Sequence, residues 1–232
     1  MSTPEKSDRI ELEFSEKYDQ PKSQRYLNKH RSGLSRRLSH WREEQVNRRA
    51  LAMADEPNLV LDLPCGAGRF WRMLCERPNR VIMAADNSKD MLDTALAEQP
   101  PEIVARVHGF QTSAFAIDLG DNAVDCIFCI RLMHHIELSE HRVAILREFH
   151  RVSRDALIVS LWVDGNYKAW RRRRDDARRI ALGREFKPRD RVLVSREVAE
   201  SEFSQAGWRV IGHVDFVPAY AMWRTYVLRK NA

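Results

Sequence analysis

A glycine-rich turn follows the first apolar run of the chain, and its residue types could hold a ligand. The apolar run and the turn together have the sequence "NLVLDLPCGAGRFW", residues 58–71. The glycines of the turn allow the backbone to approach a bound molecule closely. A turn for NAD or FAD has the pattern G-x-G-x-x-G, which places a third glycine where this chain has Trp71. The Lys-Ser/Thr pair of a phosphate-binding loop is also missing from the turn. The turn is therefore predicted to bind a nucleotide-like ligand that has no pyrophosphate.

Two further features could do chemistry with such a ligand. Asp86 ends the second apolar run, where a carboxylate could accept hydrogen bonds from both hydroxyls of a ribose. His134 and His135 follow a later apolar run, and a histidine with a pKa of about 6.5 could remove a proton from an acceptor hydroxyl. The alternative is that one histidine packs or caps the next element, while the other lines a pocket without titrating.

The spacing of apolar residues predicts the elements that must position these groups. Short apolar runs without strict alternation are typical of parallel strands buried on both faces, and helical spacing recurs between them. Helices are expected at 34–54, 68–77, from Ser88, 139–153 and 195–206, and strands at 58–63, 80–86, 102–108, 123–130 and 155–162, with a hairpin at 208–217 and 221–230. Ligands of such a sheet bind at the carboxyl ends of its strands. We therefore expect one doubly wound α/β domain with the turn at its binding edge.

Four blocks in this order resemble the class I S-adenosylmethionine-dependent methyltransferases, particularly their small-molecule branch. They are the turn at 62–68, Asp86, "DNAVDCIFCIRLMHHI" at 121–136 and "LREFHRVSRDALIVSLW" at 146–162. The resemblance covers about residues 40–162 well and the terminal hairpin moderately. It implies a Rossmann-like fold with a seven-stranded, mostly parallel sheet, one antiparallel strand and helices on both faces. The expected organisation is an N-terminal arm or cap at 1–33 and a single methyltransferase domain at 34–232, with a basic insert at about 163–193 over the substrate mouth.

The resemblance implies S-adenosylmethionine as cofactor, with Asp86 on the ribose and Asn87 near the adenine. Gln111 or Thr112 would take the place of the acidic residue that usually faces the adenine amino group. Pro64 replaces the family's first glycine, which the turn tolerates if φ there is near the value of about −65° that proline imposes. The expected cofactor-binding residues are Asp62, Leu63, Pro64, Cys65, Gly66, Gly68, Asp86, Asn87, Gln111, Thr112, Ile130 and Arg131.

Residues toward the methyl acceptor are expected at the same edge. An activated methyl group mainly needs alignment for in-line displacement, and His134 or His135 would act as a base only if the acceptor loses a proton. A guanidinium at Arg131 would meet Asp62 or the cofactor's carboxylate, or else pair with a neighbouring acid. Tyr18 resembles an N-terminal tyrosine that caps the cofactor pocket, and an exposed arm is the alternative. Substrate contacts are predicted for Tyr18, Arg131, His134, Trp162, Tyr167 and Arg171.

Two basic segments carry the excess positive charge of the chain. Residues 22–49 and 168–191 each have a local charge of +7, whereas the whole chain has +6. If both segments flank the mouth, they would concentrate an anionic small molecule or headgroup. RNA is a weaker alternative, and peripheral contact with an anionic membrane surface is a further one. A solvated charged face is the commonest fate of such runs. The second segment is expected to form a helix with Trp170, Ala177 and Ala181 inward and its arginines outward.

Composition narrows the class of protein. No apolar run approaches the roughly 20 residues that span a bilayer, and the polar start is unlike a signal peptide. Four cysteines in 232 residues favour a reducing cytoplasm, with Cys126 and Cys129 in a strand core rather than at a metal site. The rival functions are a methyltransferase-fold module without catalysis that binds RNA or protein, and an RNA methyltransferase. An NAD-dependent oxidoreductase is disfavoured by Trp71.

Overall fold

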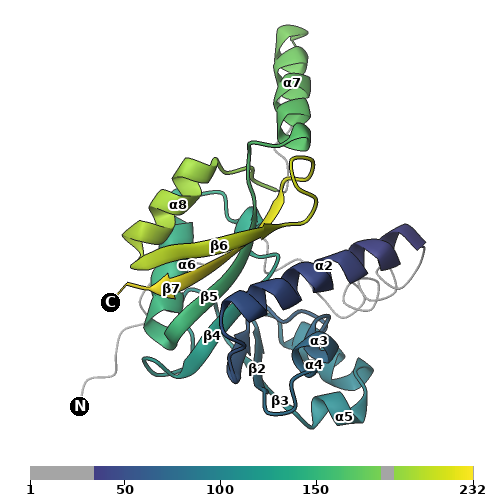
Figure 1. Ribbon diagram of the computed structural model, residues 1–232, viewed down its shortest axis with the longest axis vertical. Coiled ribbons are helices and arrows are strands. Elements are labelled where there is room, and N and C mark those ends of the chain that lie inside the picture. The colour runs from purple at the N-terminus through teal and green to yellow at the C-terminus, as the bar shows by residue number, and fades with distance from the viewer. Residues whose placement is uncertain (1–33, 184–190, 232) are drawn as a thin grey trace.

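The computed structural model describes residues 34–183 and 191–231. Within these ranges the chain forms a seven-stranded sheet with the strand order β3-β2-β1-β4-β5-β7-β6 (Figure 1). The strands are β1 Leu59–Asp62, β2 Val81–Asp86, β3 Val107–Gln111, β4 Val124–Cys129, β5 Ser153–Trp162, β6 Trp208–Asp215 and β7 Trp223–Lys230. The first five are parallel, and β7 runs antiparallel between β5 and β6. The predicted fold class is confirmed. The predicted arm, with Tyr18, lies outside the described residues.

Helices cover both faces of the sheet. They are α2 Leu34–Met53, α3 Trp71–Leu74, α4 Lys89–Glu98, α5 Pro101–Val104, α6 Ser139–Val152, α7 Tyr167–Ala181 and α8 Arg196–Gln205, with a 3-10 turn η2 Met133–His135. Figure 1 shows α6 and α8 on one face and α2, α3 and α4 on the other. Two buried apolar clusters match these faces, one including Phe149 and Phe203 and the other Leu51 and Trp71.

The central strands are buried on both faces, which explains their continuous apolar sequence. Along β4, Cys126 and Phe128 pack into the cluster beneath α2 and α3, whereas Ile127 and Cys129 pack into the one beneath α6 and α8. The prediction that Cys126 and Cys129 belong to a strand core is confirmed. Their side chains point to opposite faces, so they do not form one ligand pair.

Local signals fix where several helices begin. The Ser88 hydroxyl accepts a hydrogen bond from the Met91 amide and starts α4, as predicted. Ser195 caps α8 in the same way through the Val198 amide, and Gly207, with φ +85°, follows that helix. Asn166 caps α7 through the Ala169 amide.

Three expectations about the elements were wrong. The helix predicted over 68–77 is only α3, because Gly68 has φ +68° and the chain becomes helical after it. Residues 102–104 belong to α5 rather than to a strand, because Pro101 occupies the first helical position, where its fixed φ favours a helix. Trp170, Ala177 and Ala181 do not point inward: α7 projects from the body, and all three are exposed.

No helix in the described ranges is both long and apolar enough to cross a membrane. Nor do those ranges contain a cluster of three or more side chains that could hold a metal ion.

Candidate functional site

The glycine-rich turn lies at the carboxyl end of β1 and is shaped by Trp71. Gly66 and Gly68 have φ of +52° and +68°, a region that favours glycine. A Cβ added to Gly68 would lie 2.8 Å from the ring of Trp71, which is fully buried. Trp71 therefore packs beneath the turn at the position where a dinucleotide turn has glycine.

Asp62 is turned into the protein rather than toward solvent. Its Oδ2 accepts a hydrogen bond of 3.2 Å from Nε1 of Trp71. Burial raises the pKa of Asp62 well above its usual value, because the charged carboxylate is removed from water. Asp62 thus fixes the tryptophan that supports the turn.

Asp86 joins the turn to the loop that follows β2. Its Oδ2 accepts a hydrogen bond of 2.9 Å from the Gly66 amide, and its Oδ1 accepts one of 2.9 Å from the Ser88 amide. Burial raises the pKa of Asp86 despite these two hydrogen bonds. The carboxylate is therefore held rigidly at the end of β2, beside the turn.

The other predicted cofactor residues lie at the neighbouring strand ends. Asp86 is in register with Gln111 of β3, and Nε2 of Gln111 donates to the Asn87 carbonyl at 2.8 Å. Thr112 differs, because its hydroxyl donates to the Ala116 carbonyl and accepts from the Asp118 amide within its own loop. Asp86, Asn87 and Gln111 are thus brought together. The Thr112 amide also donates to the Asp86 carbonyl at 3.1 Å, but its side chain serves its own loop.

The remaining turn residues hold the backbone in place. The Leu63 amide donates to the Phe128 carbonyl, and the Cys65 amide donates to that of Ala85. Leu63, Cys65 and Ile130 are buried. Pro64 is not among the residues of positive φ, so the turn does not require the backbone conformation that proline lacks.

Arg131 follows β4 and pairs with an acid that the sequence did not indicate. Its Nε and Nη2 donate to the two carboxylate oxygens of Glu43 on α2, at 2.8 and 2.7 Å. Arg69, from the glycine-rich turn, reaches the same carboxylate at 2.7 Å. Burial raises the pKa of Glu43, but the two guanidinium groups outweigh it and hold that pKa below its usual value. Arg131 was expected to meet Asp62, the cofactor's carboxylate or a neighbouring acid. The structure shows it paired with an acid of the protein, which is Glu43 and not Asp62.

An aromatic cluster lies at the same edge of the sheet. His134 stacks on Trp162 at 5.5 Å between ring centroids with an interplanar angle of 8°, and its ring lies 5.0 Å from Trp223 and 4.2 Å from His135. The Arg131 guanidinium lies 4.7 Å from the Trp223 ring. Trp162 and Trp223 are register partners on β5 and β7, which places both rings at this edge.

The cluster is electrostatically unusual. Burial lowers the pKa of His134 to about 2, with His135, Arg191 and Arg131 adding to the effect. Its imidazole is therefore neutral at physiological pH. Nδ1 of His134 and Nε1 of Trp162 and of Trp223 are buried and have no hydrogen-bond partner within the described part of the chain. Such unsatisfied polar atoms are costly in a protein interior.

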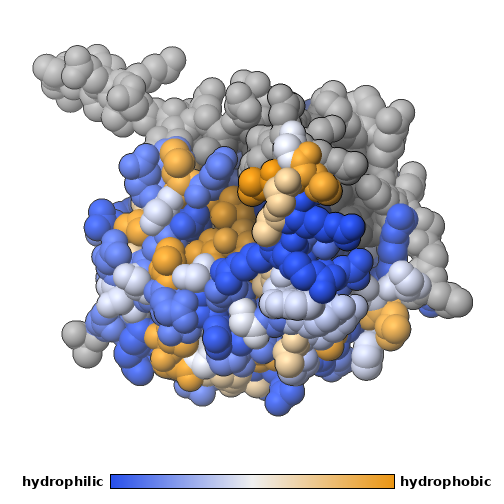
Figure 2. Space-filling model, turned by 90° about the horizontal axis from the view of Figure 1, so that it is seen from above, coloured by the Kyte–Doolittle hydropathy of each residue, from blue (hydrophilic) through white to orange (hydrophobic). Residues whose placement is uncertain are grey.

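A cationic hollow adjoins this cluster. Its volume is about 540 Å³, and its lining residues are Trp162, Lys168, Arg171, Arg172, Asp175, Arg191 and Met222. The guanidinium groups of Arg172 and Arg191 lie 5.8 and 5.2 Å from the Trp162 ring. Figure 2 shows the face of the molecule that is seen from above, where strongly hydrophilic residues and apolar residues lie side by side. Of the predicted substrate residues, Trp162 and Arg171 line this hollow, and the buried His134 stacks on Trp162.

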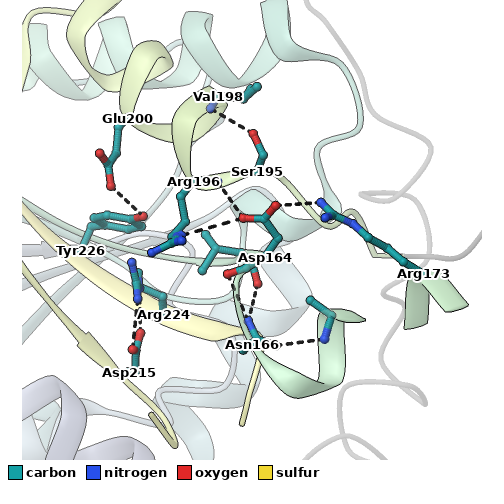
Figure 3. Close-up of polar contacts among 12 residues, drawn as sticks. Asp164, Asn166, Arg173, Ser195, Arg196, Val198, Glu200, Asp215, Arg224 and Tyr226 are labelled. Carbon is teal, nitrogen blue, oxygen red and sulfur yellow. Dashed lines mark hydrogen bonds and ion pairs between the residues drawn. The ribbon is translucent and has the colours of Figure 1, made fainter. Parts of the chain in front are cut away.

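Tyr167 lies elsewhere at the base of α7. Its ring stacks on that of Tyr220 at 5.7 Å, and it lines a separate hollow of about 360 Å³. Figure 3 shows how this base is anchored: Asp164 accepts from Nη2 of Arg173 at 2.7 Å and from the Arg196 amide at 3.1 Å. Burial would raise the pKa of Asp164, but these contacts hold it below its usual value.

Comparison with known proteins agrees with this geometry. A family model described as "Methyltransferase domain" matches residues 60–156. An uncharacterized methyltransferase-like protein of Schizosaccharomyces pombe is 32% identical over 101 residues, which are 43% of this chain and 36% of that protein. The matched region thus spans about a third of the curated relative.

Solved structures show the same fold. Magnesium protoporphyrin IX methyltransferase of Synechocystis with bound SAH has a TM-score of 0.73 at 11% identity, and the match covers 94% of this chain and 98% of that one. A SAM-dependent methyltransferase of Methanosarcina mazei has a TM-score of 0.60 at 14% identity, with 75% and 93% covered. Residues 60–156 of this chain therefore match a methyltransferase domain, and the described part of the chain has the fold of these solved methyltransferases.

Proposed function

We infer that this protein transfers the methyl group of S-adenosylmethionine to a small or medium-sized anionic acceptor. The observation that carries the inference is the bridge from Asp86 to the Gly66 amide, beside Gln111 at the end of the next strand. It joins the glycine-rich turn to the strand end where a ribose would be held. Structural neighbours of this fold bear SAH or SAM in the crystal, which supports the same cofactor here.

The residues at the turn fit that cofactor. Gly66 leaves the backbone open to a ligand, since a Cβ there would meet only Met91 Cε, at 3.5 Å. Asp86 would hold the ribose hydroxyls, and Asn87 and Gln111 would lie toward the adenine. When bound, S-adenosylmethionine supplies an activated methyl group. The protein's task is then to hold the acceptor in line with it and to exclude water.

The two histidines receive different roles in this proposal. A base must have a pKa near the working pH, and His134, with a pKa of about 2, is too weakly basic. His134 would instead position Trp162 and His135, on which its ring packs. His135 is the candidate base for an acceptor that loses a proton. The acceptor atom, O, N or C, is left open.

The acceptor site is assigned to the cationic hollow. Lys168, Arg171, Arg172 and Arg191 surround it with positive charge, opposed by Asp175 alone among its lining residues. The indole N–H of Trp162, which has no hydrogen-bond partner among the described residues, could donate to an anionic oxygen. In this proposal α7 borders the substrate mouth, as expected for the insert at about 163–193. The small-molecule methyltransferase among the neighbours supports such an acceptor.

A methyl-transfer assay tests the assignment. The wild type is incubated with methyl-labelled S-adenosylmethionine and acidic metabolites fractionated by charge. Transfer to an anionic fraction is expected, and R171Q/R172Q should raise KM for it at least about tenfold, since two cations are removed from the hollow. The matched control R147Q/R209Q removes two exposed arginines elsewhere and should leave KM unchanged. Transfer to neutral acceptors only would contradict the assignment.

The rival functions predict other outcomes. A methyltransferase-fold module without catalysis would bind RNA or protein and give no labelled product. An RNA methyltransferase would label RNA in preference to small molecules. A cytoplasmic location remains our prediction, supported by four cysteines that are all free thiols. The division into an arm at 1–33 and a domain at 34–232 also remains a prediction.

A further inference from the structure

Helix α7 has two different faces. Lys168, Arg171, Arg172 and Asp175 follow each other at i, i+3, i+4 and i+7 and line the cationic hollow. The other side of the helix holds the α7 apolar stripe, which we define as Tyr167, Trp170, Ala177, Ile180 and Ala181, together with Leu182 after the helix. Arg173 and Arg174 interrupt the stripe between Trp170 and Ala177, and the Arg174 guanidinium lies 4.7 Å from the Trp170 ring. The acceptor hollow and the stripe therefore face in different directions.

The α7 apolar stripe is exposed. Trp170, Ile180 and Leu182 have 53%, 62% and 61% of their surface accessible, and Ala169 is the one buried residue of the helix. The helix stands clear of the body, so its flank is open along most of its length (Figure 1). Tyr220 and Val217, in the loop that contacts the base of α7, are exposed as well. Exposed large apolar residues in one area mark an interaction surface.

Cations accompany the stripe. Helix α7 contains seven Lys or Arg residues and two Asp. Arg173 is bound to Asp164 at the base, as Figure 3 shows, and Arg171 lies 3.8 Å from Asp175. Arg178 and Arg179, near the far end, have no ion-pair partner among residues 34–183 and 191–231. The projecting end of α7 thus combines apolar side chains with uncompensated positive charge.

We propose that α7 docks this protein on an anionic lipid bilayer, with the α7 apolar stripe at the level of the headgroups. Helices that lie in such an interface combine a cationic polar side with Trp and aliphatic residues on the other. The long arginine side chains can reach lipid phosphates while the stripe enters the apolar boundary. A single strand of nucleic acid would instead require a row of aromatic platforms. The exposed apolar residues at this end of α7 are Ile180, Ala181 and Leu182, and none of them is aromatic.

Vesicle sedimentation tests the proposal with the full chain. The vesicles are phosphatidylcholine alone or phosphatidylcholine with 30% phosphatidylglycerol, at about 0.1 M salt. We expect sedimentation with the anionic vesicles and little with the neutral ones. Both W170S/I180S and R178Q/R179Q should weaken binding more than about tenfold, because one removes apolar contact and the other removes two cations.

Matched controls keep the result independent of folding and of the acceptor assignment. L138S/V198S replaces two exposed apolar residues elsewhere, and R147Q/R209Q removes two exposed cations elsewhere; neither should change sedimentation. Circular dichroism shows whether each variant is folded. The proposal would be overturned if the protein bound neutral vesicles as well as anionic ones, or did not bind anionic vesicles. It would also be overturned if neither α7 variant changed the binding. So would a preference for a single-stranded RNA oligonucleotide that releases the protein from vesicles.

Discussion

The carboxylate of Glu43 on α2 forms a two-pronged ion pair with Arg131, which follows β4 and lies 88 residues later in the chain. Arg69 of the glycine-rich turn reaches the same carboxylate. One buried acid therefore joins α2, the glycine-rich turn and the edge of the aromatic cluster.

Replacing that acid should destabilise the fold. E43Q leaves two guanidinium groups without their counter-charge, and we expect a loss of about 2–4 kcal/mol in the free energy of unfolding, somewhat discounted because Arg131 is partly exposed. Urea unfolding measures the loss. In E43Q/R131M the second substitution should cost less than it does alone, since its partner is already gone. If the losses of unfolding free energy in the two single variants simply added up in the double variant, Glu43 and Arg131 would not be coupled.

Acid should abolish the contribution of Glu43. Its pKa is lowered in the folded state, so its stabilisation is complete above the unfolded value of about 4.3 and is lost as pH falls through the folded pKa. The difference in unfolding free energy between wild type and E43Q should therefore be constant from pH 7 to about 5.5 and shrink below pH 4. A difference that grows toward acid would contradict the ion pair.

Asp62 should behave in the opposite way. Burial raises its folded pKa, so its ionised form opposes folding increasingly as pH rises from about 3.9 toward that pKa. D62N keeps an oxygen that can accept from Trp71 Nε1 and removes the charge. We expect D62N to gain stability relative to wild type between pH 4 and 7, followed by thermal unfolding. A parallel pH dependence of the two proteins would argue against a buried Asp62.

The turn should reject a side chain at Gly68. G68A combines an unfavourable φ of +68° with a Cβ 2.8 Å from the Trp71 ring, so we expect a loss of about 2–4 kcal/mol. G183A is a matched control, since its φ is +64° but nothing lies within 4 Å. It should lose only about 1–2 kcal/mol, the cost of the backbone conformation. Equal losses in urea unfolding would show that Trp71 does not pack beneath the turn.

His134 should stay neutral over the physiological pH range. His134 stacks on Trp162 and has a pKa of about 2, so its imidazole ¹⁵N shifts should stay those of a neutral ring from pH 8 to 4.5. The resonance that disappears in H134N identifies the residue. Protonation of His134 near pH 6 would restore it as a candidate base and weaken the role given to His135.

Much of the fold was predictable because it depends on local patterns. The apolar runs that end at Asp62 and Asp86 are strands buried on both faces, so the sequence alone sufficed to place their carboxyl ends together. Ser88 was predictable as a cap from its position alone. The boundary at Pro101 was missed because the apolar residues after it suit a strand as well as a short helix.

The contacts across the site depend on tertiary packing and were not predictable. Glu43 looked like one charge on an amphipathic helix, and nothing in its neighbourhood of the sequence points to Arg131. The outward turn of Trp170 was missed for a related reason: helical spacing shows that residues share a face but not what that face meets. The low basicity of His134 likewise comes from Trp162 and Trp223, which follow it far along the chain.

Calorimetric titration with S-adenosylmethionine tests the central claim most directly. The wild type should bind one equivalent. D86A should bind at least about tenfold more weakly, because it loses the bridge to Gly66 and the group that we propose holds the ribose. D93A, which changes an exposed aspartate of α4, should bind as the wild type does. No binding by the wild type, or equal binding by D86A, would contradict the account.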